Sequence, residues 1–91
     1  MFKDFAPLFD LTPEFDSRKS FYGKAKVQAT DGIVKLYSYD MHVATVDPAT
    51  YTVTLLPRWN ESATTLRHVK EFLKQHGLTA ESKKQTTEDY A

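Results

Sequence analysis

The chain has 91 residues, of which 41% are hydrophobic and 13% aromatic, so it can build one core and one folded domain. It has no cysteine, which excludes disulfides, thiolate nucleophiles and cysteine-ligated metal centres. Its formal net charge is zero, with 12 basic and 12 acidic residues, and such a chain is not a polycation made for nucleic acid.

Charge and hydropathy vary along the chain. Acidic residues predominate in residues 1–16 and 78–91, whereas residues 17–77 are mildly basic. No apolar run approaches the about 18 residues that a membrane span requires. Residues 1–10 also lack the basic start and the long apolar stretch of a signal peptide. We therefore expect a cytoplasmic protein.

The N-terminal arm, residues 1–18, is expected to contain a short helix. Apolar residues recur there at i, i+3, i+4 and i+7, the spacing that lines up one helical face: Phe2, Phe5, Ala6 and Phe9. Asp4 suits the N-cap position, and Pro7 then falls within the first turn, where its missing N–H is tolerated. We predict a short helix or turn over Asp4–Asp10.

The period of the apolar residues changes to two in residues 19–59, which predicts a four-stranded antiparallel meander. In the first strand an apolar set alternates with a polar and basic set: Phe21, Ala25, Val27 and Ala29 against Tyr22, Lys24, Lys26 and Gln28. The other strands are predicted over residues 33–39, 42–46 and 51–56. Short turn signals separate the strands: Asp31-Gly32, Asp40-Met41 and Asp47-Pro48-Ala49-Thr50, with Pro57 ending the last strand.

Residues 62–77 predict one helix that packs across this sheet. Ser62 suits the N-cap, and Gly77 suits the position just after the helix. At 100° per residue the large apolar side chains fall within about 120° of arc: Leu66, Val69, Phe72 and Leu73. The predicted fold class is α+β, with residues 1–77 as a single domain. Residues 78–91 are polar and aperiodic, and we expect a flexible tail there.

The opposite face of the predicted helix is a candidate partner-binding surface. It carries three cations within about 60° of arc: Arg67, Lys70 and Lys74. Three further cations could extend it toward phosphates or an acidic partner: Lys24, Lys26 and Arg58. The alternative interpretation is an ordinary solvated face, whose cations are favourably placed toward a helix C-terminus.

Thr64 and Thr65 also have two interpretations. They could help to bind an anion at the helix N-terminus, where free N–H groups favour negative charge. They could instead occupy the first turn after a Ser62 cap, so that the side-chain oxygens serve the backbone. Capping is the commoner use of this pattern.

Interspersed aromatic and basic residues are the second candidate feature. They follow one another as Tyr22, Lys24, Lys26, Lys35, Tyr37, Tyr39, Tyr51, Arg58 and Trp59. Platforms for single-stranded nucleic acid use this mixture, and so do protein interfaces. Because the net charge is zero, we expect a protein partner, with Tyr22, Tyr39 and Trp59 among its contacts.

No catalytic, cofactor-binding or metal-binding residues are predicted. His68 and His76 are too far apart for a metal clasp across one helical turn, and no carboxylate set completes a coordination shell. Ser38, Asp40 and His42 are close in sequence but lack the glycine elbow and oxyanion donors of a triad. We expect His68 to be partly buried and bonded to a loop carbonyl, and the protein not to be an enzyme.

Three blocks of the sequence resemble a group of short proteins of unknown function found in bacteriophages and in Gram-positive bacteria that carry prophages. The blocks are S-F-Y-G-K-A (Ser20 to Ala25), S-Y-D-M-H-V-A (Ser38 to Ala44) and S-A-T-T-L-R-H-V-K-E-F-L (Ser62 to Leu73). The resemblance runs from about Ser20 to Gly77, and Met41 stands where most of the group is expected to have threonine.

This resemblance implies a phage-type accessory protein, located in the host cytoplasm, and it brings no catalytic residues with it. Small phage proteins of this kind often bind and block host factors, including defence nucleases. We therefore expect a non-enzymatic protein that acts by protein–protein binding, as an anti-CRISPR-like inhibitor would. The alternative is a small nucleic-acid-binding module, and the free edges of a small sheet also leave a homodimer open.

Overall fold

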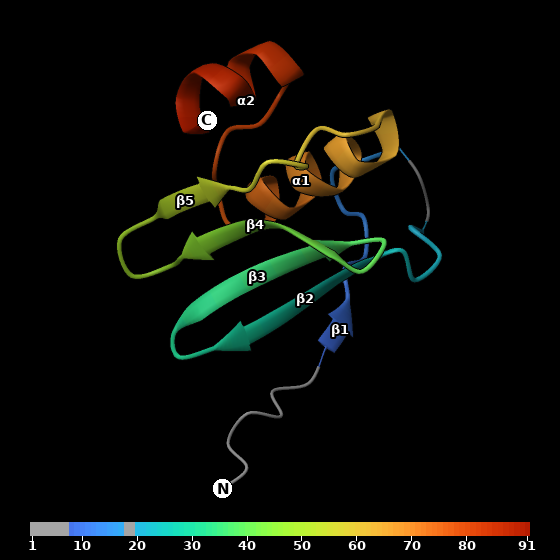
Figure 1. Cartoon of the computed structure of the whole chain (residues 1–91), viewed down its shortest axis with the longest axis horizontal. Helices are drawn as coiled ribbons and strands as arrows, with labels where there is room; N and C mark the ends of the chain where they lie inside the picture. The colour runs from blue at the N-terminus through green and yellow to red at the C-terminus, as the bar shows by residue number, and fades with distance from the viewer. Residues whose placement is uncertain (1–7, 18–19) are drawn as a thin grey trace, which may run out of the picture.

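The computed structural model describes residues 8–17 and 20–91, and in them it shows an antiparallel sheet and two helices (Figure 1). The strands are β1 (Leu8–Asp10), β2 (Ala25–Thr30), β3 (Ile33–Ser38), β4 (Met41–Asp47) and β5 (Thr52–Leu55), and the helices are α1 (Ala63–Gln75) and α2 (Lys83–Tyr90). The strands lie in the order β1-β2-β3-β4-β5, and each pairs antiparallel with its neighbours along the chain. The α+β class and the meander of β2 to β5 are confirmed.

The prediction of a helix over Asp4–Asp10 is wrong where the structure can test it. Leu8–Asp10 forms β1, a fifth strand on the free edge of β2, and residues 4–7 lie outside the described part of the chain. Asp10 lies opposite Lys26, and its carboxylate pairs with the Lys26 ammonium at 2.9 Å. The open hydrogen-bonding edge of β2 therefore determines the local structure, against the helical spacing of the phenylalanines.

The turns between the strands are tight, as predicted, but two boundaries move. Asp31 and Gly32 have φ of 53° and 78°, the left-handed conformations that a two-residue hairpin turn of this kind requires. The next reversal uses Tyr39 and Asp40, with φ of 51° and 67°, one residue earlier than the predicted Asp40-Met41 turn. The first long strand begins at Ala25 because Phe21 to Lys24 form a turn of their own, closed by Lys24 N–H donating to Phe21 C=O at 2.9 Å.

The core lies between α1 and one face of the sheet (Figure 1). From α1 it receives Val69, Phe72 and Leu73, with Leu66 half-buried, and from the sheet chiefly Ala25, Leu36, Val43, Ala44 and Val46. A bulge in β4 at the step from Leu36 to Tyr37 places Val43 in the core as an extra residue between two paired ones. The predicted apolar stripe of α1 is confirmed as the face that packs on the sheet.

Both predicted ends of α1 are confirmed. Ser62 has an extended conformation, and its hydroxyl accepts the Thr65 backbone N–H at 3.1 Å. Gly77 follows the helix with φ of 77°, which glycine adopts without steric cost. Its N–H donates to Lys74 C=O at 2.9 Å, and Leu78 N–H donates to Leu73 C=O at 3.0 Å.

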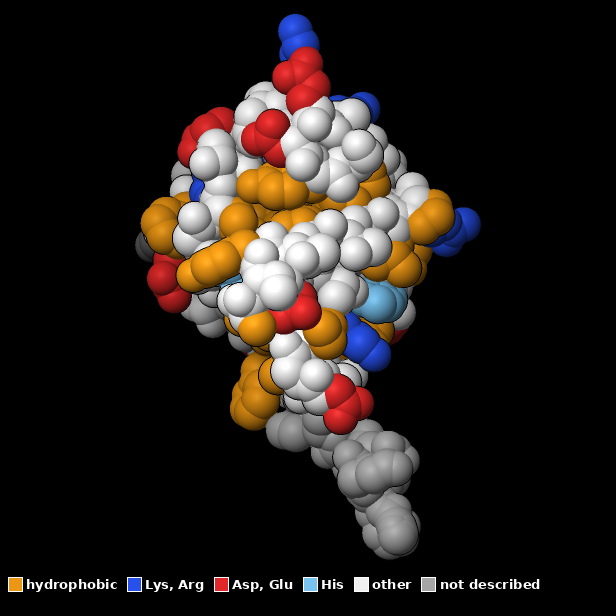
Figure 2. Space-filling model, turned by 90° about the vertical axis from the view of Figure 1, so that its left-hand side faces the viewer, with side chains coloured by type: hydrophobic (Ala, Val, Ile, Leu, Met, Phe, Trp, Pro, Cys, Tyr) orange, Lys and Arg blue, Asp and Glu red, His pale blue; other side chains and the backbone are white. Residues whose placement is uncertain are grey.

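The segment predicted as a flexible polar tail contains α2, which the sequence did not indicate. Its N-cap is Ser82, whose hydroxyl accepts the Gln85 backbone N–H, and the Tyr90 hydroxyl donates to Thr79 C=O at 3.0 Å. Ala80 and Thr86 are fully buried. α2 lies at the top of the molecule (Figure 1), and the side view shows a band of hydrophobic side chains directly below that top (Figure 2). The segment from 78 to 91 therefore contributes to the core. Neither α1 nor α2 is long and apolar enough to cross a membrane.

Candidate binding surface around Arg67

The N-terminal arm is fastened along α1 by a buried carboxylate. Glu71 is only 2% exposed, and its two oxygens accept the backbone N–H groups of Glu14 at 2.8 Å and Phe15 at 2.9 Å. The Gln75 amide donates to Glu71 and also to Thr12 C=O, the latter at 2.7 Å. The arm therefore runs beside the helix in a fixed position, and the neighbouring side chains Phe15, Asp16 and Ser17 are presented next to α1.

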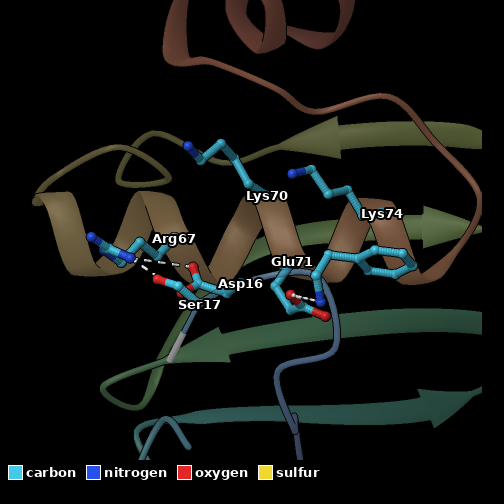
Figure 3. A pocket seen from close by; sticks show the side chains of 7 residues that line it. Asp16, Ser17, Arg67, Lys70, Glu71 and Lys74 are labelled. Atoms are coloured by element: carbon cyan, nitrogen blue, oxygen red, sulfur yellow. Dashed lines mark hydrogen bonds and ion pairs between the residues drawn. The ribbon is translucent and has the colours of Figure 1, made fainter. Parts of the chain in front are cut away.

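Arg67 ties the same arm to the first half of α1. Its guanidinium donates to the two carboxylate oxygens of Asp16 at 3.1 and 3.4 Å, and the Asp16 side chain is only 12% exposed (Figure 3). Arg67 keeps more of its surface accessible than Asp16 does, and it lines hollows on both of its sides. Arg67 is thus the centre of the candidate surface.

The first hollow, which we name the helix hollow, lies between the arm and the outer face of α1. Its volume is about 200 Å³, and it is lined by Phe15, Asp16, Ser17, Arg67, Lys70, Glu71 and Lys74. Lys70 and Lys74 extend from the same side of α1, one turn apart (Figure 3). Lys74 makes a 3.6 Å ion pair with Glu81, whereas Lys70 has no ion pair with any residue that the structure describes. The three predicted helix cations are therefore brought together in one hollow.

The second hollow, which we name the turn hollow, lies where two tight turns meet the start of α1. Its volume is about 180 Å³, and it is lined by Ser20, Phe21, Tyr22, Lys24, Tyr39, Thr64, Arg67 and His68. Tyr22 is 77% exposed and Tyr39 is 46% exposed. The two turns are joined because Tyr39 N–H donates to Lys24 C=O at 2.8 Å. The structure thus brings Tyr22, Lys24 and Tyr39 together beside Arg67.

His68 forms part of the floor of the turn hollow, and it is more buried than the sequence suggested. His68 has no exposed surface, and Nδ1 hydrogen-bonds the Ser38 hydroxyl at 2.8 Å. Ser38 in turn donates to the Thr65 hydroxyl at 3.1 Å. The His68 ring meets Phe21 edge-on, with centroids 4.5 Å apart, and lies 5.9 Å from the Tyr39 ring. This polar network connects β3 to α1 beneath the hollow.

Ser38 and His42, which with Asp40 are close in sequence, lie on opposite faces of the sheet. Ser38 faces α1, whereas His42 lies on the other face, where its ring stacks against Tyr37 with centroids 5.3 Å apart. Burial, together with the nearby Lys35 charge, lowers the pKa of His42 below its ordinary value of 6.5. The His42 Nε2 atom hydrogen-bonds Thr45. In residues 8–17 and 20–91 no group of His, Cys, Asp and Glu side chains could hold a metal ion.

The other three predicted partner-binding residues are not among those that line either hollow. Trp59 is 6% exposed and belongs to the core, because the chain between β5 and α1 folds it inward. Arg58 makes an ion pair with Glu61 at 3.1 Å and donates to the Met41 sulfur. Lys26 lies on the sheet face opposite α1, in the pair with Asp10 described above.

Sequence reasoning missed the arm residues Phe15 and Asp16, and it missed the α1 residue Glu71 that holds the arm. Phe15 belongs to no periodic pattern, and it is exposed beside the helix cations. Glu71 carried one available signal. At 100° per residue it lies next to Gln75 and His68, on a side of the helix that belongs neither to the apolar stripe nor to the cationic one. A polar strip of this kind can indicate a second packing partner.

Comparisons with known proteins place the chain in a family but do not assign it a function. Neither a search of curated proteins nor a search of solved structures gave a significant match. A family model described as a family of unknown function, DUF8033, matches residues 9–88, which includes all the strands except the first residue of β1, all of α1 and most of α2. The chain therefore belongs to the DUF8033 family of unknown function.

Proposed function

We propose that this protein is a non-enzymatic binding protein that holds an acidic segment of a protein partner in the helix hollow. The observation that carries the proposal is the grouping of Arg67, Lys70 and Lys74 beside an exposed phenylalanine, Phe15, whose side chain is 57% exposed. Arginine and aromatic side chains are enriched at protein interfaces and supply most of their hot spots.

The charge in the helix hollow favours an acidic partner. Two carboxylates line it, but Glu71 is already occupied by two backbone N–H groups and an amide, and Asp16 is paired with Arg67. The charge of Lys70 is not balanced by an ion pair among the described residues, and Lys74 has only a partly exposed pair at 3.6 Å. A partner carboxylate could therefore pair with Lys70 without first breaking an internal ion pair.

The resemblance to phage-type accessory proteins suggests which partner to look for. On that basis we propose a host protein as the partner and inhibition of a host factor or defence system as the outcome. Expression of the chain in a defended host should then raise the plating efficiency of a phage that the defence restricts. An unchanged plating efficiency would contradict inhibition of that defence. The binding of a protein partner is tested separately, by charge reversal.

Charge reversal in the helix hollow tests the binding. The double variant Lys70→Glu, Lys74→Glu should lose a partner that the wild-type chain retains through affinity capture and crosslinking from host lysate. Lys83→Glu, Lys84→Glu is the matched control, because it makes the same charge change on exposed α2 residues. Melting temperatures of both variants should stay close to wild type, since exposed ion pairs contribute little. Equal capture by both double variants would contradict the proposal.

A second candidate function is the binding of single-stranded nucleic acid on the sheet face opposite α1. The specific observation is a row of side chains across that face, Lys26 opposite Tyr37 and Tyr37 opposite His42, with Lys35 in the next row. Aromatic rings among cations offer stacking platforms for bases. Affinity for a labelled oligonucleotide should then fall steeply with salt, and Lys26→Glu with Lys35→Glu should weaken it. No gel shift at low salt would remove this candidate.

A further inference from the structure

The turn hollow differs from the helix hollow in that none of the described residues lining it is a carboxylate. Its lining contains two cations, Lys24 and Arg67, and two exposed tyrosines, Tyr22 and Tyr39. The floor is made by the edge-to-face rings of Phe21 and His68. A ligand that fits this chemistry needs both a flat ring and an anionic group.

The two tyrosines are held in a backbone conformation that disfavours them. Tyr22 has φ of 53° and Tyr39 has φ of 51°, in the left-handed region that Gly and Asn occupy at lower cost. Strain alone does not mark a site, since Tyr51 has φ of 57° in the turn at the other end of the sheet. What distinguishes Tyr22 and Tyr39 is that both line the same hollow beside two cations. Strained residues in such a place indicate a use for their side chains.

We propose that the turn hollow binds a single nucleotide unit, with the base against the tyrosine rings and the phosphate between Lys24 and Arg67. The Lys24 ammonium lies over the Tyr39 ring, 6.0 Å from its centroid, and it would turn from the ring toward the phosphate when a base stacks there. The Thr64 hydroxyl in the lining can hydrogen-bond the polar edge of a base, which a phosphorylated tyrosine side chain does not have.

Two sources could supply this nucleotide unit: a free mononucleotide, or one nucleotide of a single strand. The inference does not rest on the acidic protein partner proposed above. The test substitutes Lys24 and Tyr39, which line only the turn hollow, and it leaves Lys70, Lys74 and the shared Arg67 unchanged. Loss of one activity is therefore distinguishable from loss of the other.

The experiment is a titration of the full chain with AMP, GMP, CMP and UMP. Binding is measured by calorimetry and by changes in amide chemical shifts. At least one mononucleotide should bind more tightly than adenosine, which lacks the phosphate, inorganic phosphate, which lacks the ring, and O-phosphotyrosine. Tyr39→Asn should lower the affinity about tenfold, the effect of losing one aromatic stack. Lys24→Glu should lower it as well, through loss of the cation.

The control is Tyr51→Asn, which relieves the same backbone strain outside the hollow. Both asparagine variants should melt at or above the wild-type temperature, because Asn suits a left-handed turn position. Lost binding in Tyr39→Asn would then not reflect unfolding.

Tighter binding of a short oligothymidylate than of free nucleotides would identify a strand as the source, and the reverse would identify the free nucleotide. Absence of mononucleotide binding at millimolar concentration, equal affinity of Tyr39→Asn and wild type, or tighter binding of phosphotyrosine would overturn the inference.

Discussion

Glu71 is the residue on which the position of the N-terminal arm depends. A buried carboxylate is stable only when its charge is matched by donors, and here two backbone N–H groups and the Gln75 amide provide them. The same two hydrogen bonds satisfy backbone groups of an arm that belongs to no helix or strand at Glu14 and Phe15. By holding this part of the arm, Glu71 positions Phe15 and Asp16 at the helix hollow.

Replacing Glu71 should loosen the arm and lower stability. Glu71→Ala leaves two backbone N–H groups without their acceptor, and we expect the free energy of unfolding to fall by about 2 to 3 kcal/mol. Glu71→Gln should also be destabilising, because its amide nitrogen would face one of those N–H donors. Urea denaturation measures both changes. Glu81→Ala is the control, since its exposed pair with Lys74 should contribute less than about 1 kcal/mol. Equal stability of the two alanine variants would contradict the role of Glu71.

The residues that sequence reasoning placed correctly are those whose environment is set nearby in the chain. Ser62 and Gly77 were predictable because caps depend on the residues that flank a helix. His68 and Glu71 were not, since both are buried by segments far away in sequence: the β3 residue Ser38 for His68, and the arm for Glu71. Trp59 was misplaced for the same reason, because its burial depends on how the segment after β5 folds.

At the scale of elements, α1 has three sides. One packs on the sheet through Val69, Phe72 and Leu73, one carries the cations, and the third holds the arm through Glu71 and Gln75. The hydrophobic pattern showed the first side clearly, because the sheet supplies a wide apolar surface. At Glu14 and Phe15 the arm attaches through its backbone N–H groups, and such contacts leave no apolar signature in the helix sequence.

The start of α1 can be tested through its cap. Ser62→Ala removes the acceptor of the Thr65 N–H, and we expect stability to fall by about 1 kcal/mol. Ser62→Asp keeps an acceptor at the same place and adds a charge that the helix N-terminus favours, so it should stay near wild type. Thermal melts followed by circular dichroism compare the two. An alanine variant that melts with the wild type would argue against this cap.

The two misassigned elements failed for different physical reasons. At Leu8–Asp10 the helical spacing was present, but the edge of β2 offered backbone hydrogen bonds that a short proline-containing helix could not equal. In α2 the apolar signal was almost absent, because only Thr86 of the helix is buried and its sequence is polar. The apolar residues that pack this segment are Ala80, which precedes α2, and Tyr90, its last residue. They produce no helical periodicity in the sequence.

At the scale of the molecule, the C-terminal segment completes the domain. Deletion of residues 79–91 removes the fully buried Ala80 and the partly buried Tyr90, which packs against the core beside it. We expect this truncation to lower the free energy of unfolding by about 2 kcal/mol or more, and to reduce the cooperativity of the transition. Leu78 is kept so that its N–H still caps α1. A free polar tail would give no change, and that result would contradict the packing of α2.

The strands lie in the sheet in the same order as in the chain, so each strand pairs with the next one along the sequence. The meander of β2 to β5 could therefore be predicted from its short turns. The surface around Arg67 could be predicted only in part. Its cations lie on one helix, whereas Phe15 and Asp16 come from the arm, and Tyr22 and Tyr39 come from two separate turns. Bringing these segments together requires the whole fold, which no local pattern specifies.

The buried position of Trp59 has an optical consequence. It is the only tryptophan of the chain, it lies in the core, and it is not among the residues that line either hollow. Its fluorescence should therefore change when the domain unfolds and stay constant when a ligand occupies either hollow. Tyr22 and Tyr39 line the turn hollow, so quenching of tyrosine emission would report a stacked base there. The molecule thus carries separate spectroscopic reporters for its folding and for its binding.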